Sequence, residues 1–470
     1  MGSKKEHFKK FTQGYTFKII LLFLLVILML IPLTLIQSLI SERNRTATTA
    51  EEGIMEAWGS QLVAVGPVIA VPGIRTEQNI TRTDRDGEKV ETIRNPFALI
   101  ITPQKLDIHS NFKTEIRKRG IFSVPLFSGE LVFSGTFNPE KALSSLLANE
   151  EVYFNQAELI IALSSQKGIR KIDNAVWNNG TLGQRELFFQ PGNLGYIFAR
   201  AQNLTYSRYS ANSQTNSGIY AAIPDFTNSE SPFNIEIAIQ GGQLVRFLPM
   251  GQDTHIEVSA DWPSPSFQGA FLPGSSDITD NGFDAVWDIS YLSRDIPLYW
   301  KSESNENSRR DYADSLFGVN FFRTIDTYSL NTRAVKYAIL FLIVPFLTLF
   351  LLEVFTKKRI HPVPYLLSGI ANIIFYLLLL SLSEQMQFYL AYLIASAAVA
   401  ILLTLYSRSL LPSWKKSGYM GLVVTLSYIL LYAVLNAESY ALLIGSIGTF
   451  VVIALVMFIT RRLDWYGSDE

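Results

Sequence analysis

The stretch from Ala334 to Arg462 constrains this chain most, because it holds five long apolar runs separated only by short polar breaks. A bilayer core requires about 20 apolar residues per spanning helix, and these runs fit that length. A water-soluble domain does not need five such runs in succession. The sequence therefore predicts an integral membrane protein with a five-helix transmembrane domain over residues 334–462.

The composition combines two different kinds of chain. Of the 470 residues, 17% are charged, against roughly 25% in a soluble protein. Residues 17–40 and 334–460 carry the apolar excess, whereas residues 41–333 have an ordinary polar composition. A net charge of −1 gives no indication of a nucleic-acid partner. The absence of cysteine excludes disulfides, thiolate metal sites and cysteine nucleophiles.

The N-terminal region predicts an uncleaved membrane anchor. A lysine-rich tail over residues 1–16 precedes an apolar run at residues 17–40. A cleaved signal peptide has a shorter apolar region, about 7 to 15 residues, and ends at a small-residue cleavage site. This run is longer and lacks that site, so we interpret residues 17–40 as the first span.

Lysine and arginine in the short flanks predict the orientation of the spans. Basic residues occupy the breaks at 357–359 and 408–416 and the end of the last run at 461–462. The intervening turns at 383–387 and 436–439 contain no lysine or arginine. This alternation predicts six spans with both termini cytoplasmic, a cytoplasmic C-terminal tail at 463–470, and residues 41–333 in the periplasm.

The inserted segment, residues 41–333, has mostly a period-two pattern, which is typical of strands. Residues 233–239 and 255–259 alternate clearly between apolar and polar side chains. One helix is predicted, with Asn138 as its N-cap and a body over residues 141–149. Strands without regular intervening helices predict a large, mainly antiparallel β domain, a sandwich inserted between spans 1 and 2.

Fragments along nearly the whole chain, in matching order and spacing, resemble the CreD family of inner-membrane proteins from bacterial CreBC-type two-component regulons. These fragments are Arg119–Pro125, Asp261–Pro273, Gly282–Trp287, Ser315–Val319, Arg333–Ala338, Arg359–Val363 and Leu377–Glu384. The resemblance implies a bacterial cytoplasmic-membrane protein with a periplasmic domain. It also implies a link to envelope integrity, colicin tolerance and β-lactam responses, but it brings no established biochemical activity.

Enzyme signatures are absent from the sequence. It lacks the H-E-x-x-H, G-x-S-x-G, Walker A and G-x-G-x-x-G motifs, so we predict no catalytic, cofactor-binding or metal-ligating residues. His109 and His255 are the only histidines outside the membrane block and the N-terminal tail, and we expect no zinc site from two isolated histidines. Asp253, Glu257 and Asp261 would share one face of a strand, which fits a solvated edge or, less well, a glycosidase-like carboxylate pair.

The proline-rich loop at 261–273 is the candidate partner-binding element of the β domain. Its prolines cannot donate to a β ladder, and Trp262, Phe267 and Phe271 give it aromatic surface. These rings fit either a rigid contact for an envelope protein, lipid or glycan, or a plug that closes the end of the sandwich.

Four polar side chains in or beside the membrane block are candidate intramembrane sites, because ionisable groups are costly there. Glu353 lies near the cytoplasmic end of the second span, where Lys357 at i+4 is its expected partner. Asn372 lies mid-span and is expected to hydrogen-bond another helix. His361 lies in a basic turn, and Glu384 lies at an outer turn where we expect it to face water.

The sequence thus favours a non-enzymatic envelope protein whose periplasmic domain binds a partner or envelope component. One alternative is a transporter or lipid-handling protein in which Glu353 and Asn372 line a polar path. The other is a periplasmic enzyme that acts on glycans or lipids. The predicted partners are the lipid bilayer and an envelope protein or glycan, with no nucleic acid and no cofactor, and the sequence does not predict the oligomeric state.

Overall fold

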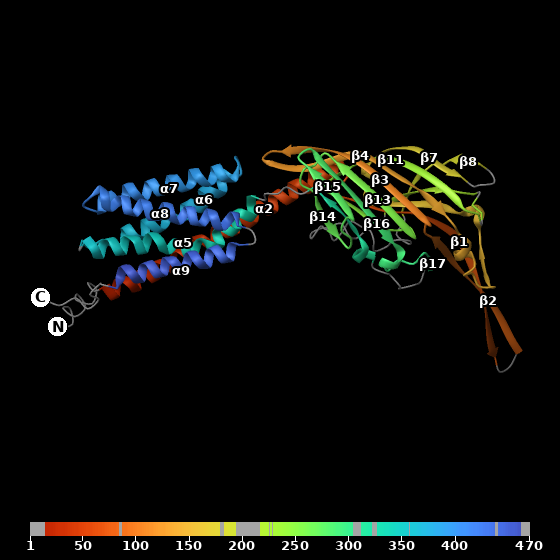
Figure 1. The fold of residues 1–470 in the computed structure, drawn as a ribbon. Helices are drawn as coiled ribbons and strands as arrows, with labels where there is room; N and C mark the ends of the chain where they lie inside the picture. Colours follow the sequence, from red (N-terminus) through yellow and green to blue (C-terminus); the bar gives the residue numbers. More distant parts are fainter. Residues whose placement is uncertain are drawn as a thin grey trace. The chain divides into compact units, whose positions relative to one another are not determined.

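A computed structural model describes residues 15–83, 87–178, 183–193, 217–224, 226–227, 229–303, 312–321, 327–356, 358–437 and 440–461 (Figure 1). The chain divides into two compact units. The first unit combines Met1–Thr48 with Ile325–Glu470, and the second is Thr49–Thr324. Most of the predicted terminal tails, 1–16 and 463–470, lies outside the described residues.

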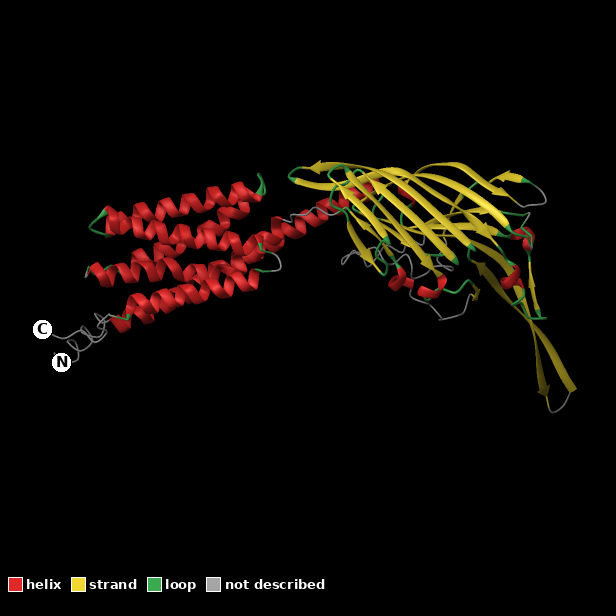
Figure 2. Ribbon diagram, viewed as in Figure 1, coloured by secondary structure: helices red, strands yellow, loops and turns green. Residues whose placement is uncertain are grey.

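Helices make up the first unit, and six helices in the described part of the chain are long and apolar enough to cross a membrane (Figure 2). They confirm the predicted arrangement of one N-terminal and five C-terminal helices. The six are α2 (Tyr15–Trp58), α5 (Thr327–Thr356), α6 (Pro362–Ser383), α7 (Phe388–Leu410), α8 (Trp414–Asn436) and α9 (Ala441–Thr460).

The first helix extends further than its apolar run. The expected anchor ends at residue 40, but α2 continues to Trp58. Its last turn is held within the second unit, where Met55 packs with Val124 and Leu126. The indole nitrogen of Trp58 donates to the carbonyl of Phe127 at 3.3 Å. These tertiary contacts fix a polar helical end whose sequence carries no membrane signal.

Strands build the second unit as two sheets that share one buried apolar core. The ten-stranded sheet contains β1 (Leu62–Thr83), β2 (Gly87–Ile101), β5 (Glu150–Val152), β6 (Glu158–Leu163), β9 (Gln190–Asn193), β10 (Ser217–Ala222), β12 (Leu244–Leu248), β14 (Ser266–Gly269), β17 (Tyr299–Glu303) and β18 (Phe317–Asn320). The eight-stranded sheet contains β3 (Lys105–Arg119), β4 (Phe122–Phe137), β7 (Ile169–Asn178), β8 (Gln184–Glu186), β11 (Ser231–Gly242), β13 (Asp253–Ala260), β15 (Ser275–Thr279) and β16 (Gly282–Ser290). This confirms the predicted large β domain between the first and second spans.

Most strand pairs are antiparallel, and two are parallel. The eight-stranded sheet has the order β15-β16-β13-β3-β4-β11-β7-β8. Within it, β13 and β3 run parallel, and Glu257 lies opposite His109 in their register. The second parallel pair joins β1 and β12 in the other sheet. The β13–β3 pair places two distant polar segments side by side on one sheet.

The predicted helix after Asn138 is shorter than expected. The side chain of Asn138 accepts a hydrogen bond from the backbone N–H of Glu140 at 3.2 Å, but α3 covers only Glu140–Leu143. The hydroxyls of Ser144 and Ser145 donate to backbone carbonyls within this turn. Serine side chains compete with backbone helix bonds in this way, and the helix stops here.

Candidate functional site

Glu353 is buried at the end of α5, and its partner is a residue of the first helix. The Lys18 ammonium pairs with Oε1 of Glu353 and donates to the carbonyl of Ile360 at 3.1 Å. The hydroxyl of Tyr365 donates to Oε2 of Glu353 at 2.8 Å. The expected partner, Lys357, lies outside the described residues. The carboxylate is therefore held by groups from α2 and α6.

Glu384, just after α6, is not exposed to water as expected. Its side chain is only 11% exposed. Arg43 of α2 binds it through two hydrogen bonds, Nε to Oε1 and Nη2 to Oε2, each 2.7 Å long. The hydroxyl of Tyr328 donates to Oε1 at 3.0 Å. The expectation of simple exposure was wrong because α2 brings a guanidinium to this turn from 341 positions away.

Asn372 connects three helices through its amide group. Pro345 in α5 has no N–H, so the carbonyl of Phe341, four residues earlier, loses its usual helical donor. The Nδ2 of Asn372 donates to that carbonyl at 3.1 Å. The hydroxyl of Tyr428 in α8 donates to Oδ1 of Asn372 at 2.7 Å. This confirms the expected interhelical bond. The Asn372 amide supplies the hydrogen-bond donor that Pro345 lacks.

His361 lies in the turn before α6. It occupies the N-cap position, and its ring accepts from the backbone N–H of Val363 at 3.4 Å. Pro362 follows at the first helical position, where a missing N–H costs nothing. The geometry assigns His361 a helix-capping contact.

The three aromatic rings of the 261–273 loop lie partly buried against the core of the β domain. Trp262 packs edge-on against Phe321, and Phe267 packs edge-on against Phe283 and Trp287. Phe271 packs edge-on against Phe317. The loop also contains the short strand β14, which pairs with β18. A role of these rings as a partner contact stays a prediction.

The outward face of the eight-stranded sheet carries the polar cluster that the sequence did not reveal. Along β13 the side chains alternate between exposed and buried, with Asp253 and Glu257 exposed and Thr254 and Ile256 buried. Neighbouring outward positions on β3, β4 and β16 are also polar or charged, including His109, Glu130 and Asp284. Asp253 and Glu257 share an exposed face as expected, but Asp261 lies just beyond the end of β13. The expected edge position was wrong, because β13 lies between β16 and β3.

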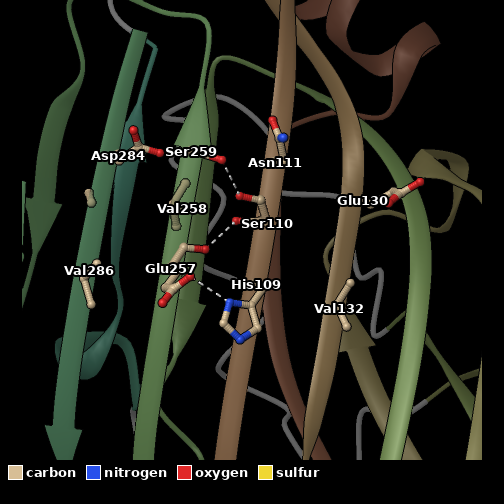
Figure 3. A pocket seen from close by; sticks show the side chains of 11 residues that line it. His109, Ser110, Asn111, Glu130, Val132, Glu257, Val258, Ser259, Asp284 and Val286 are labelled. Carbon is tan, nitrogen blue, oxygen red and sulfur yellow. Dashed lines mark hydrogen bonds and ion pairs between the residues drawn. The ribbon is translucent and has the colours of Figure 1, made fainter. Parts of the chain in front are cut away.

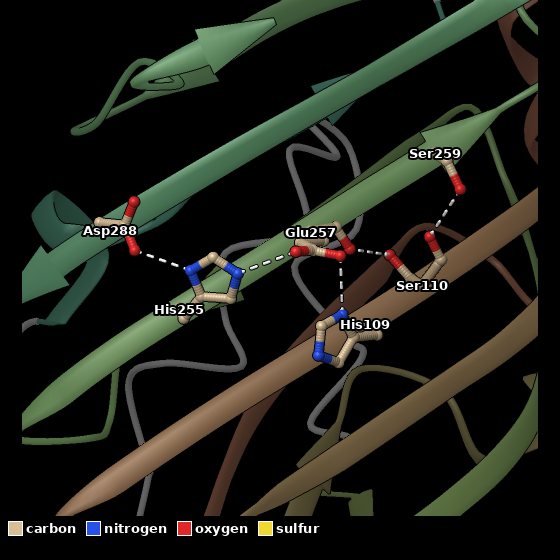
Figure 4. Close-up of polar contacts among 6 residues, drawn as sticks. All are labelled: His109, Ser110, His255, Glu257, Ser259 and Asp288. Carbon is tan, nitrogen blue, oxygen red and sulfur yellow. Dashed lines mark hydrogen bonds and ion pairs between the residues drawn. The ribbon is translucent and has the colours of Figure 1, made fainter.

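At the centre of this face, four side chains form a chain of hydrogen bonds (Figure 4). Nδ1 of His109 lies 2.9 Å from Oε2 of Glu257. Nε2 of His255 lies 3.0 Å from the other oxygen of that carboxylate, and Nδ1 of His255 lies 2.7 Å from Oδ1 of Asp288. We call His109, Glu257, His255 and Asp288 the histidine–carboxylate cluster.

The cluster lies beside a hollow of about 240 Å³ (Figure 3). His109 and Glu257 line the hollow together with Asn111, Glu130, Val132 and Asp284, among others. Beneath it, the hydroxyl of Ser110 donates to the carbonyl of Glu257 at 3.2 Å, and the hydroxyl of Ser259 donates to the carbonyl of Ser110 at 3.2 Å. These bonds tie β3 to β13 below the exposed side chains.

Hydrogen bonds within the cluster shift the pKa values of His255 and Glu257. The hydrogen bond to Asp288, and next the one to Glu257, raise the pKa of His255 above its ordinary value of 6.5. The hydrogen bonds from His255 and then His109 lower the pKa of Glu257 below its ordinary value of 4.5. The arrangement therefore favours a protonated His255 and an ionised Glu257.

The cluster offers exposed donors and acceptors for recognition. In the described part of the chain, no group of three or more His, Cys, Asp or Glu side chains is arranged to hold a metal ion. The side chain of Glu257 is 50% exposed and that of His255 is 32% exposed. In the sequence the two histidines are isolated. His109 and Glu257 are 148 positions apart and come into contact because β3 pairs with β13.

The fold and these contacts define a class of membrane protein with six apolar helices and a large β domain inserted after the first. The family model for inner membrane protein CreD matches residues 14–466, and the chain belongs to the CreD family. It is 29% identical over 448 residues to the inner membrane protein CreD of Escherichia coli (strain K12), covering 95% of this chain and 92% of that protein. The family places the chain in the inner membrane.

Proposed function

We propose that this CreD-family protein is a non-enzymatic envelope protein whose β domain binds a partner protein or envelope component outside the cytoplasm. The histidine–carboxylate cluster beside its hollow carries this proposal. Exposed ion pairs contribute little to stability, so an ordered chain of four exposed titratable side chains is not required for folding. A ligand with cationic or hydrogen-bond-donating groups fits the carboxyl groups of this face, including those of Glu257, Asp284 and Asp288.

The charge state of Glu257 argues against glycosidase chemistry on this face. A general acid must hold a proton at working pH, and glycosidases raise the pKa of that carboxyl. The pKa of Glu257 is lowered instead. Half of its side chain is also exposed to water, so the surroundings provide none of the exclusion of water that strengthens electrostatic catalysis.

The helix contacts support a topology in which both termini and the basic turns share the cytoplasmic side. Lys18 bonds to Ile360, so the start of α2 lies beside the turn that carries Lys358 and Arg359. Arg43 bonds to Glu384 at the opposite end of α6. Because positive residues favour the cytoplasmic side, the β domain, which follows Arg43, is periplasmic in this proposal.

The same contacts weigh against a polar transport path. Glu353 is neutralised by Lys18, and both ends of the Asn372 amide are bonded to α5 and α8. A transport path would leave polar groups facing a cavity at the midplane. We therefore propose a structural role for Glu353 and Asn372.

For the whole protein we propose a role in envelope integrity and stress responses.

Site-specific crosslinking in living cells tests the proposed binding face, because the natural chain has no cysteine. A cysteine at Val132, inside the hollow, would be compared with one at Thr136, on the same strand and outside it. An impermeant thiol crosslinker should give a specific adduct only from position 132. Adding Glu257→Gln should reduce that adduct several-fold.

Equal labelling of both cysteines by a small impermeant thiol reagent is the control for exposure and for topology. Labelling at both positions with no adduct from position 132 would refute binding at this face. An adduct unaffected by Glu257→Gln would show that the cluster does not recognise the partner.

A further inference from the structure

The turn between β3 and β4 concentrates cations and exposed apolar side chains. Arg117, Lys118 and Arg119 end β3 and are all exposed. Gly120 follows in a left-handed conformation, with φ +63°. Ile116 and Ile121 are 48% and 41% exposed. This hairpin tip, residues 116–121, presents three cations and two isoleucines to the surroundings.

Within the described part of the hairpin, an ion pair with Glu115 offsets one of these cations. Nε of Arg117 lies 2.7 Å from the Oε1 of Glu115. The register pairs Lys118 with Ser123 and Arg119 with Phe122, so the opposite strand supplies no carboxylate. Residues 116–121 themselves are therefore cationic, while the end of α2 beside them carries Glu51, Glu52 and Glu56.

The hairpin tip runs back along the end of α2. The guanidinium of Arg117 lies 3.6 Å from the ring centroid of Trp58. Two residues further on, Nη1 of Arg119 lies 3.4 Å from the position that a Cβ on Gly53 would occupy. The contacts of Arg117 and Arg119 thus follow the end of α2 from Trp58 to Gly53.

Chain connectivity limits how far this tip can lie from the first span. The apolar run of α2 ends at residue 40, and only 13 residues separate it from Gly53 (53 − 40). Even fully extended, such a segment spans no more than about 45 Å. Cations beside exposed isoleucines match the boundary between phosphate headgroups and acyl chains.

We propose that the hairpin tip docks on the anionic phospholipid headgroups of the leaflet that faces the β domain. In this arrangement Lys118 and Arg119 contact phosphates, and Ile116 and Ile121 reach the headgroup–acyl boundary. This contact is independent of the histidine–carboxylate cluster, which lies on other residues of β3, β13 and β16. Its role is to hold the β domain in one orientation to the membrane.

The full-length chain in lipid nanodiscs tests this contact. A cysteine at Ile121, labelled with an environment-sensitive fluorophore, reports contact through quenching by lipids that carry a headgroup-level quencher. We expect strong quenching in phosphatidylglycerol nanodiscs and little in phosphatidylcholine nanodiscs. Raising the salt from about 0.1 M to about 1 M should reduce the quenching, because screening becomes effective over a few ångströms.

Charge variants distinguish lipid contact from mere proximity. Removing two cations with Lys118→Gln and Arg119→Gln should weaken the contact by roughly 30-fold, since each cation near an anionic surface contributes about fivefold. The matched control is Lys105→Gln with Lys141→Gln. Lys105 begins the same 15-residue strand, about 45 Å from Arg119.

The control variant should leave the quenching unchanged. Equal quenching in the two lipids, or no effect of Lys118→Gln with Arg119→Gln, would overturn the proposal. Circular dichroism of each variant would show that the sheet is intact, so a lost signal could not be attributed to unfolding.

Discussion

Lys18 and Arg43 lie 25 residues apart on α2 (43 − 18), and each forms an ion pair with a glutamate of the five C-terminal helices. At 1.5 Å per residue the two cations are about 37 Å apart along the helix, slightly more than the roughly 30 Å of a hydrocarbon core. This spacing fits one ion pair near each face of the membrane. The first helix is fixed to the block at both ends, although its midsection is apolar.

Breaking the pair of Arg43 with Glu384 should loosen α2 from the block. Glu384→Gln removes the charge that binds the guanidinium, and we expect a loss of about 1 kcal/mol, a modest figure because the Arg43 side chain is 36% exposed. The measurement is thermal unfolding in nanodiscs. Exchanging the charges with Arg43→Glu and Glu384→Arg should recover most of the loss, whereas Glu42→Gln, at an exposed position beside Arg43, should have a smaller effect. Failure of the exchange to recover any stability would count against the pair.

Asn372 should contribute more to stability while Pro345 is present. Asn372→Leu leaves the carbonyl of Phe341 without its donor, and we expect a loss of about 1 kcal/mol in the stability of the helix block. In a Pro345→Ala background the new N–H can donate to that carbonyl, so the same change should cost clearly less. A double-mutant cycle by reversible unfolding measures this coupling. Equal costs in the two backgrounds would mean that Asn372 does not replace the missing helix bond.

Glu150 should be a buried charge that stabilises the β domain. Its fully buried side chain binds Arg75 at 2.9 Å and Lys301 at 2.5 Å. Burial alone would raise its pKa, but the hydrogen bond from Leu147 and those from Lys301 and Arg75 lower it to about 2. Glu150→Gln should therefore cost about 3 kcal/mol at neutral pH.

The pH dependence of that stabilisation follows from the direction of the shift. A lowered pKa gives stability that is complete above the ordinary value of 4.5 and is lost as the pH falls toward 2. Denaturant unfolding of the full chain should therefore show the difference between natural protein and Glu150→Gln shrinking over that window. Glu151→Gln, at the exposed neighbouring position, is the control. A difference that stayed constant down to pH 2 would contradict the assignment.

His255 should titrate above its ordinary pKa of 6.5 because Asp288 and Glu257 bind its ring. NMR of labelled histidines can resolve it, because the chain has only four. Asp288→Asn should move the midpoint down, whereas Asp284→Asn, four residues earlier on the exposed face of β16, should move it less. A raised pKa contributes stability below pH 6.5 that is lost as the pH rises through the folded value. On this exposed face the contribution should be about 0.5 kcal/mol. An unchanged midpoint in Asp288→Asn would rule out the bond between the ring and Asp288.

The sequence alone determined the features that depend on local patterns. Apolar runs of about bilayer length identified six spans, because a spanning helix must satisfy its backbone internally and meet lipid with apolar side chains. Period-two alternation identified the inserted β domain. Asn372 was recognised as an interhelical contact because an amide in hydrocarbon must find a partner.

The tertiary structure alone decided which side chains meet. Glu353 pairs with Lys18 across 335 positions, and Glu384 pairs with Arg43 across 341, because helix packing and not sequence spacing selects the partner. His109 and His255 are isolated in the sequence, yet both rings contact the carboxylate of Glu257. They do so because β3 and β13 pair in parallel. A parallel pairing of distant strands depends on the whole arrangement of the sheet, so no local pattern encodes it.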